Sequence, residues 1–316
     1  MTDSSPYAHA GWPDVNVAGW AATKKSLHLY AQMLGKLRLA LAPPQPNWVF
    51  TSLALTARGL TTGPLPWHDG SVAGMLDVFD SELVLERSDG ERRTIALVPA
   101  RTVAEVYADF TTALAALGIA CTIVPIPQEL PDTTPMNEDA RSADYDPGAV
   151  RRWFTAATTA AGIFDRWRSH FFGRAGIHVW WGAFDVAILL FNGKQVTPPA
   201  NRGYLMKYDL DAELMNAGLF FGDAATAPYF YGYIYPQPAG AERLPIAPAA
   251  ASWSTATGEW VLPYDAVRGA ADPPAEVRRF LDALYTNCVD AAGWNRAALA
   301  YTAPPLAGKR DTAENA

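Results

Sequence analysis

The segment GIHVWWGAFDVAILLF, residues 176–191, is the most apolar stretch of the chain and the one that decides its fold class. As a single strand it would be about 53 Å long, at roughly 3.3 Å per residue, which exceeds the strand lengths of ordinary domains. A two-residue turn at Gly182–Ala183 would fold it into a hairpin in which Trp180 opposes Asp185. The segment therefore predicts an antiparallel sheet.

The same turn brings the only two ionisable side chains of the segment onto one face. His178 and Asp185 then lie one diagonal step apart, close enough for contact, either directly or through water. A carboxylate beside an imidazole fixes its tautomer and raises its basicity, which predicts general acid–base chemistry. The alternative is a satisfied buried pair that only orders the core.

The remaining secondary structure follows from the spacing of apolar residues. Helices are predicted at 21–42, 102–117, 148–171 and 274–291, and strands at 48–56, 72–79, 82–88, 92–98, 119–125, 213–221, 228–236 and 258–263. We expect an α+β fold of antiparallel sheets with packed helices, arranged as a pseudo-duplicated helix–four strands–helix unit. Coincidence of a common pattern is the alternative explanation of the repeat.

Composition shifts divide the chain into five segments. They are an N-terminal extension at 1–20, a first α+β half at 21–126, a proline-rich and acidic connector at 127–147, a second α+β half at 148–302 packed on the first, and a flexible tail at 303–316. We expect the two halves to pack as one unit.

Charge and composition limit the partners of the chain. Its 316 residues carry a net charge of −7 and contain no lysine or arginine cluster, which argues against binding to nucleic acid or to an anionic membrane. We expect no membrane span and no secretory signal. Cys121 and Cys288 lie among apolar neighbours and are expected to be free thiols in the cytoplasm. Nothing in the sequence indicates the oligomeric state.

Two groups of side chains are candidates for binding a ligand. His28, Gln32 and Lys36 form a narrow polar stripe on an apolar helix, which predicts either the lining of a wet cavity or a partly exposed helix edge. The strand YFYGYIY (229–235) places Tyr229, Tyr231, Tyr233 and Tyr235 on one face. That face is either the wall of a small-molecule pocket, together with Trp180 and Trp181, or an aromatic ladder under a helix.

Two single residues complete the candidate site. Arg58, in TARGLTTGPLP, could hold a carboxylate or phosphate, although a structural salt bridge is the commoner use of such an arginine. Glu213, in DAELMNAG, is a possible second acid.

Seven stretches together resemble a bacterial family of uncharacterised proteins. They are TKKSLHLYAQMLGKLRLALAPPQPNW (23–48), LTARGLTTGPLP (55–66), VPARTVAEVYADF (98–110), ADYDP (143–147), HVWWGAFDVAILLFNGK (178–194), NAGLFFG (216–222) and YFYGYIYPQP (229–238). The resemblance implies a shared fold and no particular activity. The chain departs from the family pattern at Ser142, where the family has histidine, and at 211–213, where Asp-Ala-Glu replaces Ser-His-Glu. If those histidines formed a metal site with His28 and His178, half of that site is missing here.

The chain lacks the sequence motifs of serine hydrolases, zinc proteases and dinucleotide-binding proteins. We therefore predict a small-molecule enzyme that uses neither metal nor cofactor, with a pocket between the halves. His178, oriented by Asp185, would perform an isomerisation, cyclisation or elimination, Glu213 would be a further acid, and Arg58 or Lys36 would hold an anionic group of the substrate. One alternative is a non-catalytic protein that binds a small molecule or a partner in the same cavity, and another is a metalloenzyme built on His28 and His178.

Overall fold

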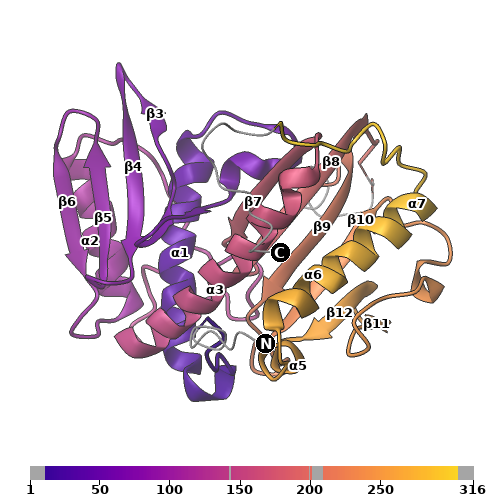
Figure 1. The fold of residues 1–316 in the computed structure, drawn as a ribbon. Helices are drawn as coiled ribbons and strands as arrows, with labels where there is room; N and C mark the ends of the chain where they lie inside the picture. Colours follow the sequence, from indigo (N-terminus) through magenta and orange to yellow (C-terminus); the bar gives the residue numbers. More distant parts are fainter. Residues whose placement is uncertain (1–10, 142–143, 199, 201–208, 305–316) are drawn as a thin grey trace.

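The computed structural model describes residues 11–141, 144–198, 200 and 209–304. Residues 1–10 of the expected N-terminal extension, residues 305–316 of the expected tail, and Ser142 lie outside these ranges. Two antiparallel sheets and the helices packed on them form an α+β fold (Figure 1), as the sequence predicts.

The first sheet follows a long helix and precedes a shorter one. Its elements are α1 (Ala21–Leu41), the 3-10 helix η2 (Pro46–Thr51), β1 (Ala54–Leu55), β2 (Gly59–Thr61), β3 (Leu65–Trp67), β4 (Gly70–Asp77), β5 (Glu82–Arg87), β6 (Arg92–Ala96) and α2 (Val103–Ala116). The strand order is β1-β2-β4-β5-β6, and β3 pairs with β4. Gly90, with a φ of 97°, lies in the turn between β5 and β6, where the Asp-Gly pair supplies the positive φ that a tight turn requires.

The second sheet is also flanked by helices. Its elements are α3 (Pro147–Trp167), β7 (Arg174–Trp180), β8 (Asp185–Gln195), β9 (Ala212–Phe220), β10 (Tyr229–Tyr235), β11 (Ser252–Ser254), β12 (Glu259–Pro263), α5 (Tyr264–Arg268), α6 (Pro273–Ala283), the π-helical turn η5 (Leu284–Cys288) and α7 (Val289–Ala291). The strand order is β11-β12-β10-β9-β8-β7.

Two predicted strands are wrong. Segment 48–56 is not one strand: residues 48–51 belong to η2 and only Ala54–Leu55 is a strand, because Pro46 starts a helical turn and Asn47 and Trp48 adopt left-handed φ values of 57° and 52°. Segment 119–125 forms no strand; the hydroxyl of Tyr107 on α2 donates to the Ile123 carbonyl at 2.9 Å and holds the segment beside that helix.

The structure does not confirm the pseudo-duplication. Both halves run helix, strands, helix, but each sheet described here has six strands rather than the four of the expected unit. The extra strands are short, such as β2, β3 and β11, and they lack the apolar alternation by which the longer strands are recognised.

The two faces of the second sheet have different surroundings. Helices α3 and α6 cover one face (Figure 1), where Val186 of β8 and Phe230 of β10 belong to the main core. Successive side chains of a strand point to opposite faces. Ala187 and Tyr231 therefore lie on the other face, in a second and smaller apolar cluster. The site described below lies on this second face.

The two sheets are joined by backbone hydrogen bonds between the halves. Leu53, just before β1, exchanges two hydrogen bonds of 2.9 Å with Val179 of β7. Both residues are buried in a core cluster to which both halves contribute. This bridge places η2 beside the end of β7, where the hairpin turn begins.

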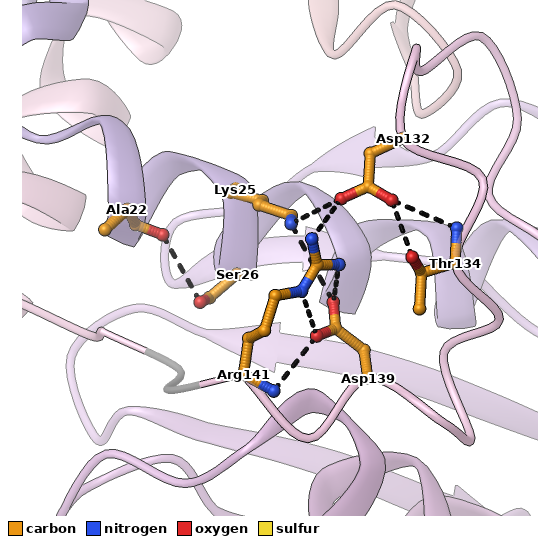
Figure 2. Close-up of polar contacts among 7 residues, drawn as sticks. All are labelled: Ala22, Lys25, Ser26, Asp132, Thr134, Asp139 and Arg141. Atoms are coloured by element: carbon orange, nitrogen blue, oxygen red, sulfur yellow. Dashed lines mark hydrogen bonds and ion pairs between the residues drawn. The ribbon is translucent and has the colours of Figure 1, made fainter.

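An ion-pair network holds the connector against α1 (Figure 2). Lys25 of α1 contacts Asp132 at 2.8 Å, and Arg141 contacts Asp132 at 2.5 Å and Asp139 at 2.7 Å. The hydrogen bond from Arg141 holds the pKa of Asp139 below its usual range despite burial of that carboxyl. The connector between residues 128 and 141 is therefore an ordered part of the fold.

Among the described helices, none is both long and apolar enough to cross a membrane. Cys121 and Cys288 are free, as expected from their surroundings.

Candidate functional site

A cavity of about 370 Å³ lies on the face of the second sheet that α3 and α6 leave uncovered. Strands β8, β9, β10 and β12 form its floor, and η2, the connector and the β7–β8 turn form its rim. The lining residues are Trp48, Thr51, Glu129, Trp180, Trp181, Gly182, Ala183, Asp185, Leu189, Asp209, Leu214, Asn216, Phe220, Tyr229, Tyr231, Tyr233 and Glu259. Its volume is in the range of small-molecule sites.

The hairpin formed by residues 176–191 has the predicted register. Trp180 pairs with Asp185 and His178 pairs with Ala187, so His178 and Asp185 do lie on one face of the sheet. The turn is one residue wider on each side than predicted, since Phe184 leaves the strand with a φ of 59°. Trp180, Trp181 and Asp185 all line the cavity.

Asp185 is buried yet borders the cavity. Only 3 % of its surface is exposed, its Oδ2 accepts a short hydrogen bond from the hydroxyl of Tyr231, and its Oδ1 has no partner among the described residues. Burial raises the pKa of Asp185 to about 7, although the bond from Tyr231 opposes this shift. Burial together with Asp185 also raises the pKa of Tyr231 well above its usual value, so this phenol remains a proton donor.

A glycine makes the contact between Tyr231 and Asp185 possible. Tyr231 lies on β10 and Asp185 on β8, and the strand between them carries Gly218 opposite Tyr231. A Cβ at Gly218 would lie 2.6 Å from the Tyr231 hydroxyl oxygen. The phenol therefore crosses β9 through the space that the missing side chain leaves.

The tyrosine face of β10 divides between two roles. Tyr229, Tyr231 and Tyr233 line the cavity, whereas Tyr235 packs against the smaller apolar cluster and does not. The amide nitrogen of Asn216 donates to the Tyr233 hydroxyl at 3.0 Å, and within the part of the chain that the structure describes the Oδ1 of Asn216 has no partner. Either orientation of this amide leaves one of its buried polar atoms unpaired.

Three further carboxyl groups border the cavity. They come from the connector (Glu129), the segment before β9 (Asp209) and the start of β12 (Glu259). Burial raises the pKa of each, to about 7 for Asp209, where Glu129 adds to the shift. The carboxylate of Glu129 packs against Gly182, and Glu259 accepts a bond of 3.3 Å from the hydroxyl of Tyr229.

His178 does not act on Asp185 in this structure. Its Nδ1 bonds to the hydroxyl of Ser52 at 2.7 Å, and its ring leans along the strand over Gly176, away from Asp185. Trp180, stacked on it with ring centroids 5.4 Å apart, lines the cavity, and His178 does not. Burial, aided by nearby arginines, lowers the pKa of His178 to about 4. The expected contact fails because each polar group finds a nearer partner.

The three residues of the polar stripe of α1 are buried, and none is among the described residues that line this cavity. Nε2 of His28 donates to the carbonyls of Trp181 and Gly182 at 2.8 and 3.0 Å. Gln32 donates to the Gln128 carbonyl at 2.9 Å and accepts from its N–H at 2.8 Å. The stripe is therefore not a partly exposed helix edge; His28 and Gln32 fix the hairpin turn and the connector, which form the cavity rim.

The other end of the stripe is also buried. The Lys36 ammonium lies 5.6 Å from the centre of the Trp181 ring, and burial lowers the pKa of Lys36 to about 8. Lys36 does not line the cavity, so the role expected for it there has no geometric support.

Arg58 and Glu213 also lie away from the cavity lining. Arg58 binds Asp77 at 2.5 Å and Asp80 at 2.7 Å, which is the structural salt bridge considered as its commoner use. Glu213 accepts a hydrogen bond from Asn192 and lies 3.6 Å from the Lys194 ammonium. Each side chain already has partners of its own.

The metal hypothesis gains no geometric support. His28 and His178 bond to different parts of the fold, and in the described ranges no group of three His, Cys, Asp or Glu side chains is arranged to hold a metal ion. At the departures near β9, Asp211 accepts a bond of 2.5 Å from the Asn47 amide.

Comparison with known proteins identifies the family of the chain. The model of a family described as a family of unknown function (DUF5996) matches residues 12–301, so the chain belongs to that family. This confirms the resemblance to an uncharacterised family. Neither the curated proteins nor the solved structures contain a match.

Proposed function

We propose that this member of the DUF5996 family is a small-molecule enzyme whose reaction is a proton transfer, with Asp185 as the acid–base group. The observation that supports this most is the state of that carboxyl. It is almost fully buried at a cavity wall, one oxygen is held by Tyr231, and the other has no partner. A ligand in the cavity would meet an oriented and unsatisfied oxygen.

The pKa of Asp185 supports the same role. A group whose pKa is about 7 exchanges protons readily in both directions near neutral pH, which suits general acid–base catalysis. Tyr231 holds the second oxygen and keeps its own proton, so it acts as the positioning partner of Asp185. Isomerisation, cyclisation and elimination need no more than such a pair.

The proposal moves the acid–base role from His178 to Asp185. His178 donates to or accepts from Ser52 and is separated from the ligand space by Trp180. Its lowered pKa keeps it neutral at pH 7. We assign His178 the role of fixing β7 against the segment that precedes β1.

A second candidate is a binding protein without catalysis, using the same cavity. The aromatic walls favour it equally, since Trp48, Trp180 and Trp181 provide contact area for any apolar ligand. The two candidates differ in whether Asp185 changes the ligand.

Proton exchange with solvent distinguishes them. A mixture of metabolites is incubated in D₂O with the wild type, with Asp185→Asn, and with His178→Gln, and each compound is followed by mass spectrometry. The proposal expects one compound to gain deuterium or to be converted with the wild type and His178→Gln, but not with Asp185→Asn. Loss with His178→Gln alone would return the role to His178. A compound that co-purifies with all three proteins but is neither deuterated nor converted would favour the binding protein.

A further inference from the structure

The described lining of the cavity combines acidic and aromatic side chains. Its lining includes four carboxyl groups, three tryptophans, three tyrosines and a phenylalanine, and the described lining residues include no lysine, arginine or histidine. Carboxylates and aromatic faces share one property: both attract a positive charge.

The nearby lysines do not neutralise this cavity from within. Lys24 lies 5.6 Å from the ring centre of Phe220 and donates to the Gly222 carbonyl, and Lys36 lies 5.6 Å from that of Trp181. Each contacts a wall residue without joining the lining. Burial raises the pKa of Asp185 and Asp209 to about 7, because the charged form of a carboxyl group is costly away from water unless a positive charge lies beside it.

We propose that the ligand of this cavity is a small protonated primary or secondary amine with an apolar body. The inference rests on the proposed function, because it names the class of molecule that the same cavity would take. The carboxyl group of Asp185, whose Oδ1 has no partner among the described residues, would accept an N–H of the ammonium, and the amide of Asn216 adds a second polar group on the same floor. The rings of Trp180, Trp181 and Tyr229 would enclose the charge and the apolar body.

The arrangement of the carboxyl groups favours an organic cation over a metal ion. They come from the connector, the segment before β9, β8 and β12, and in the part of the chain that the structure describes no three of them could share one metal ion. Carboxyl groups distributed around a cavity of about 370 Å³ fit a charge carried on a larger body.

Four probes that share a phenyl ring and differ in their polar group test the preference of the cavity for a positive charge. Benzylamine, benzyltrimethylammonium, benzyl alcohol and benzoate are titrated into the protein, and binding is followed by ligand-observed NMR. We expect benzylamine to bind about tenfold more tightly than benzyl alcohol, benzyltrimethylammonium to lie between them because it lacks an N–H, and benzoate to bind most weakly.

Three variants locate the effect. Asp185→Asn and Glu259→Gln remove one carboxylate each and should reduce the preference for benzylamine over benzyl alcohol to about threefold or less. Asp80→Asn removes an exposed carboxylate paired with Arg58, and it should leave the preference unchanged. Circular dichroism checks that each variant is folded, and the two cavity variants provide independent readings.

The outcomes separate this inference from the proposed function. Equal or tighter binding of benzyl alcohol or benzoate would overturn the amine inference. If that binding were lost in Leu189→Trp, which fills the cavity floor, the cavity would still be a ligand site and the proposed function would stand. If no probe and no metabolite responded to Leu189→Trp, both would fail.

Discussion

Tyr231 on β10 and Asp185 on β8 share a short hydrogen bond although a whole strand lies between them. The contact is possible because the intervening strand has no side chain at Gly218, where the phenol crosses. It fixes one oxygen of a buried acid that lines the cavity, and the other oxygen has no partner among the described residues. The predictions below test this relationship and the elements that support it.

Tyr231→Phe should destabilise the protein by about 1–3 kcal/mol, because it removes the hydrogen bond of a buried carboxyl and leaves both of its oxygens unpaired. Urea unfolding measures the change. Tyr235→Phe is the matched control, since Tyr235 lies on the same strand face but does not line the cavity. Equal losses of unfolding free energy in Tyr231→Phe and Tyr235→Phe would show that the hydrogen bond to Asp185 does not stabilise the fold.

Gly218→Ala should displace the phenol of Tyr231, because the new methyl group would lie 2.6 Å from its oxygen. We expect a loss of about 1–3 kcal/mol in the free energy of unfolding. The double variant Gly218→Ala/Tyr231→Phe should lose less stability than the sum of the two single losses, because both substitutions act on one contact. Gly19→Ala, where the added methyl meets nothing within 4 Å, is the control. Full additivity would contradict the shared mechanism.

The stability of the wild type relative to Asp185→Asn should fall as pH rises from about 4 to about 7. Burial raises the pKa of Asp185 from 3.8 to about 7, so the folded state holds an additional proton across that range. Its contribution is complete below pH of about 4 and is lost as pH rises through the folded-state pKa. Unfolding of both proteins at several pH values measures the difference. A pH-independent difference would show that Asp185 titrates as it does in the unfolded chain.

Binding of benzyltrimethylammonium should tighten as pH rises from about 6 to about 8. The probe itself does not titrate, whereas Asp185 and Asp209 ionise in this range and Lys24 and Lys36, whose pKa values are lowered by burial to about 8, begin to lose charge. All four changes make the surroundings more negative. NMR titrations at each pH give the affinity, and weaker binding at pH 8 would contradict the assignment of these groups.

Gln32→Ala should loosen the cavity rim more than the rest of the fold. Gln32 makes two hydrogen bonds to the backbone of Gln128, the neighbour of Glu129, and it is fully buried. We expect a loss of about 1–3 kcal/mol in the free energy of unfolding and faster amide hydrogen exchange in residues 128–130. Gln45→Ala, at an exposed position, should change neither. Unchanged exchange at the connector would remove its assigned anchor.

The fold class and the central hairpin could be predicted from the sequence because they depend on local pattern. The length of segment 176–191 and the position of Gly182 predict the pairing of Trp180 with Asp185. The alternation in YFYGYIY predicts the tyrosine face. The run at 48–56 looked like a strand by composition. Its backbone instead turns at Asn47 and Trp48, which have left-handed φ values. The pattern of apolar residues does not indicate such backbone angles.

The cavity could be predicted only in part. Its tryptophans and tyrosines lie in periodic strands, and Asn216 is recognisable as a lone amide within an apolar strand. Glu129 and Asp209 come from irregular segments, and only tertiary packing brings them to the rim. The contact of Asp185 with Tyr231 likewise depends on Gly218 of β9. No spacing within 176–191 reveals this residue.

The alternation of faces along the second sheet separates two kinds of evolutionary constraint. Val186 and Phe230 point into the helix-covered core, whereas their neighbours Asp185 and Tyr231 point to the cavity. A substitution at a cavity position alters the lining of the proposed ligand site without repacking α3 or α6, and the reverse holds at a core position. Under the proposed function, alternate residues of β8, β9 and β10 would therefore set the ligand preference while the scaffold stays the same.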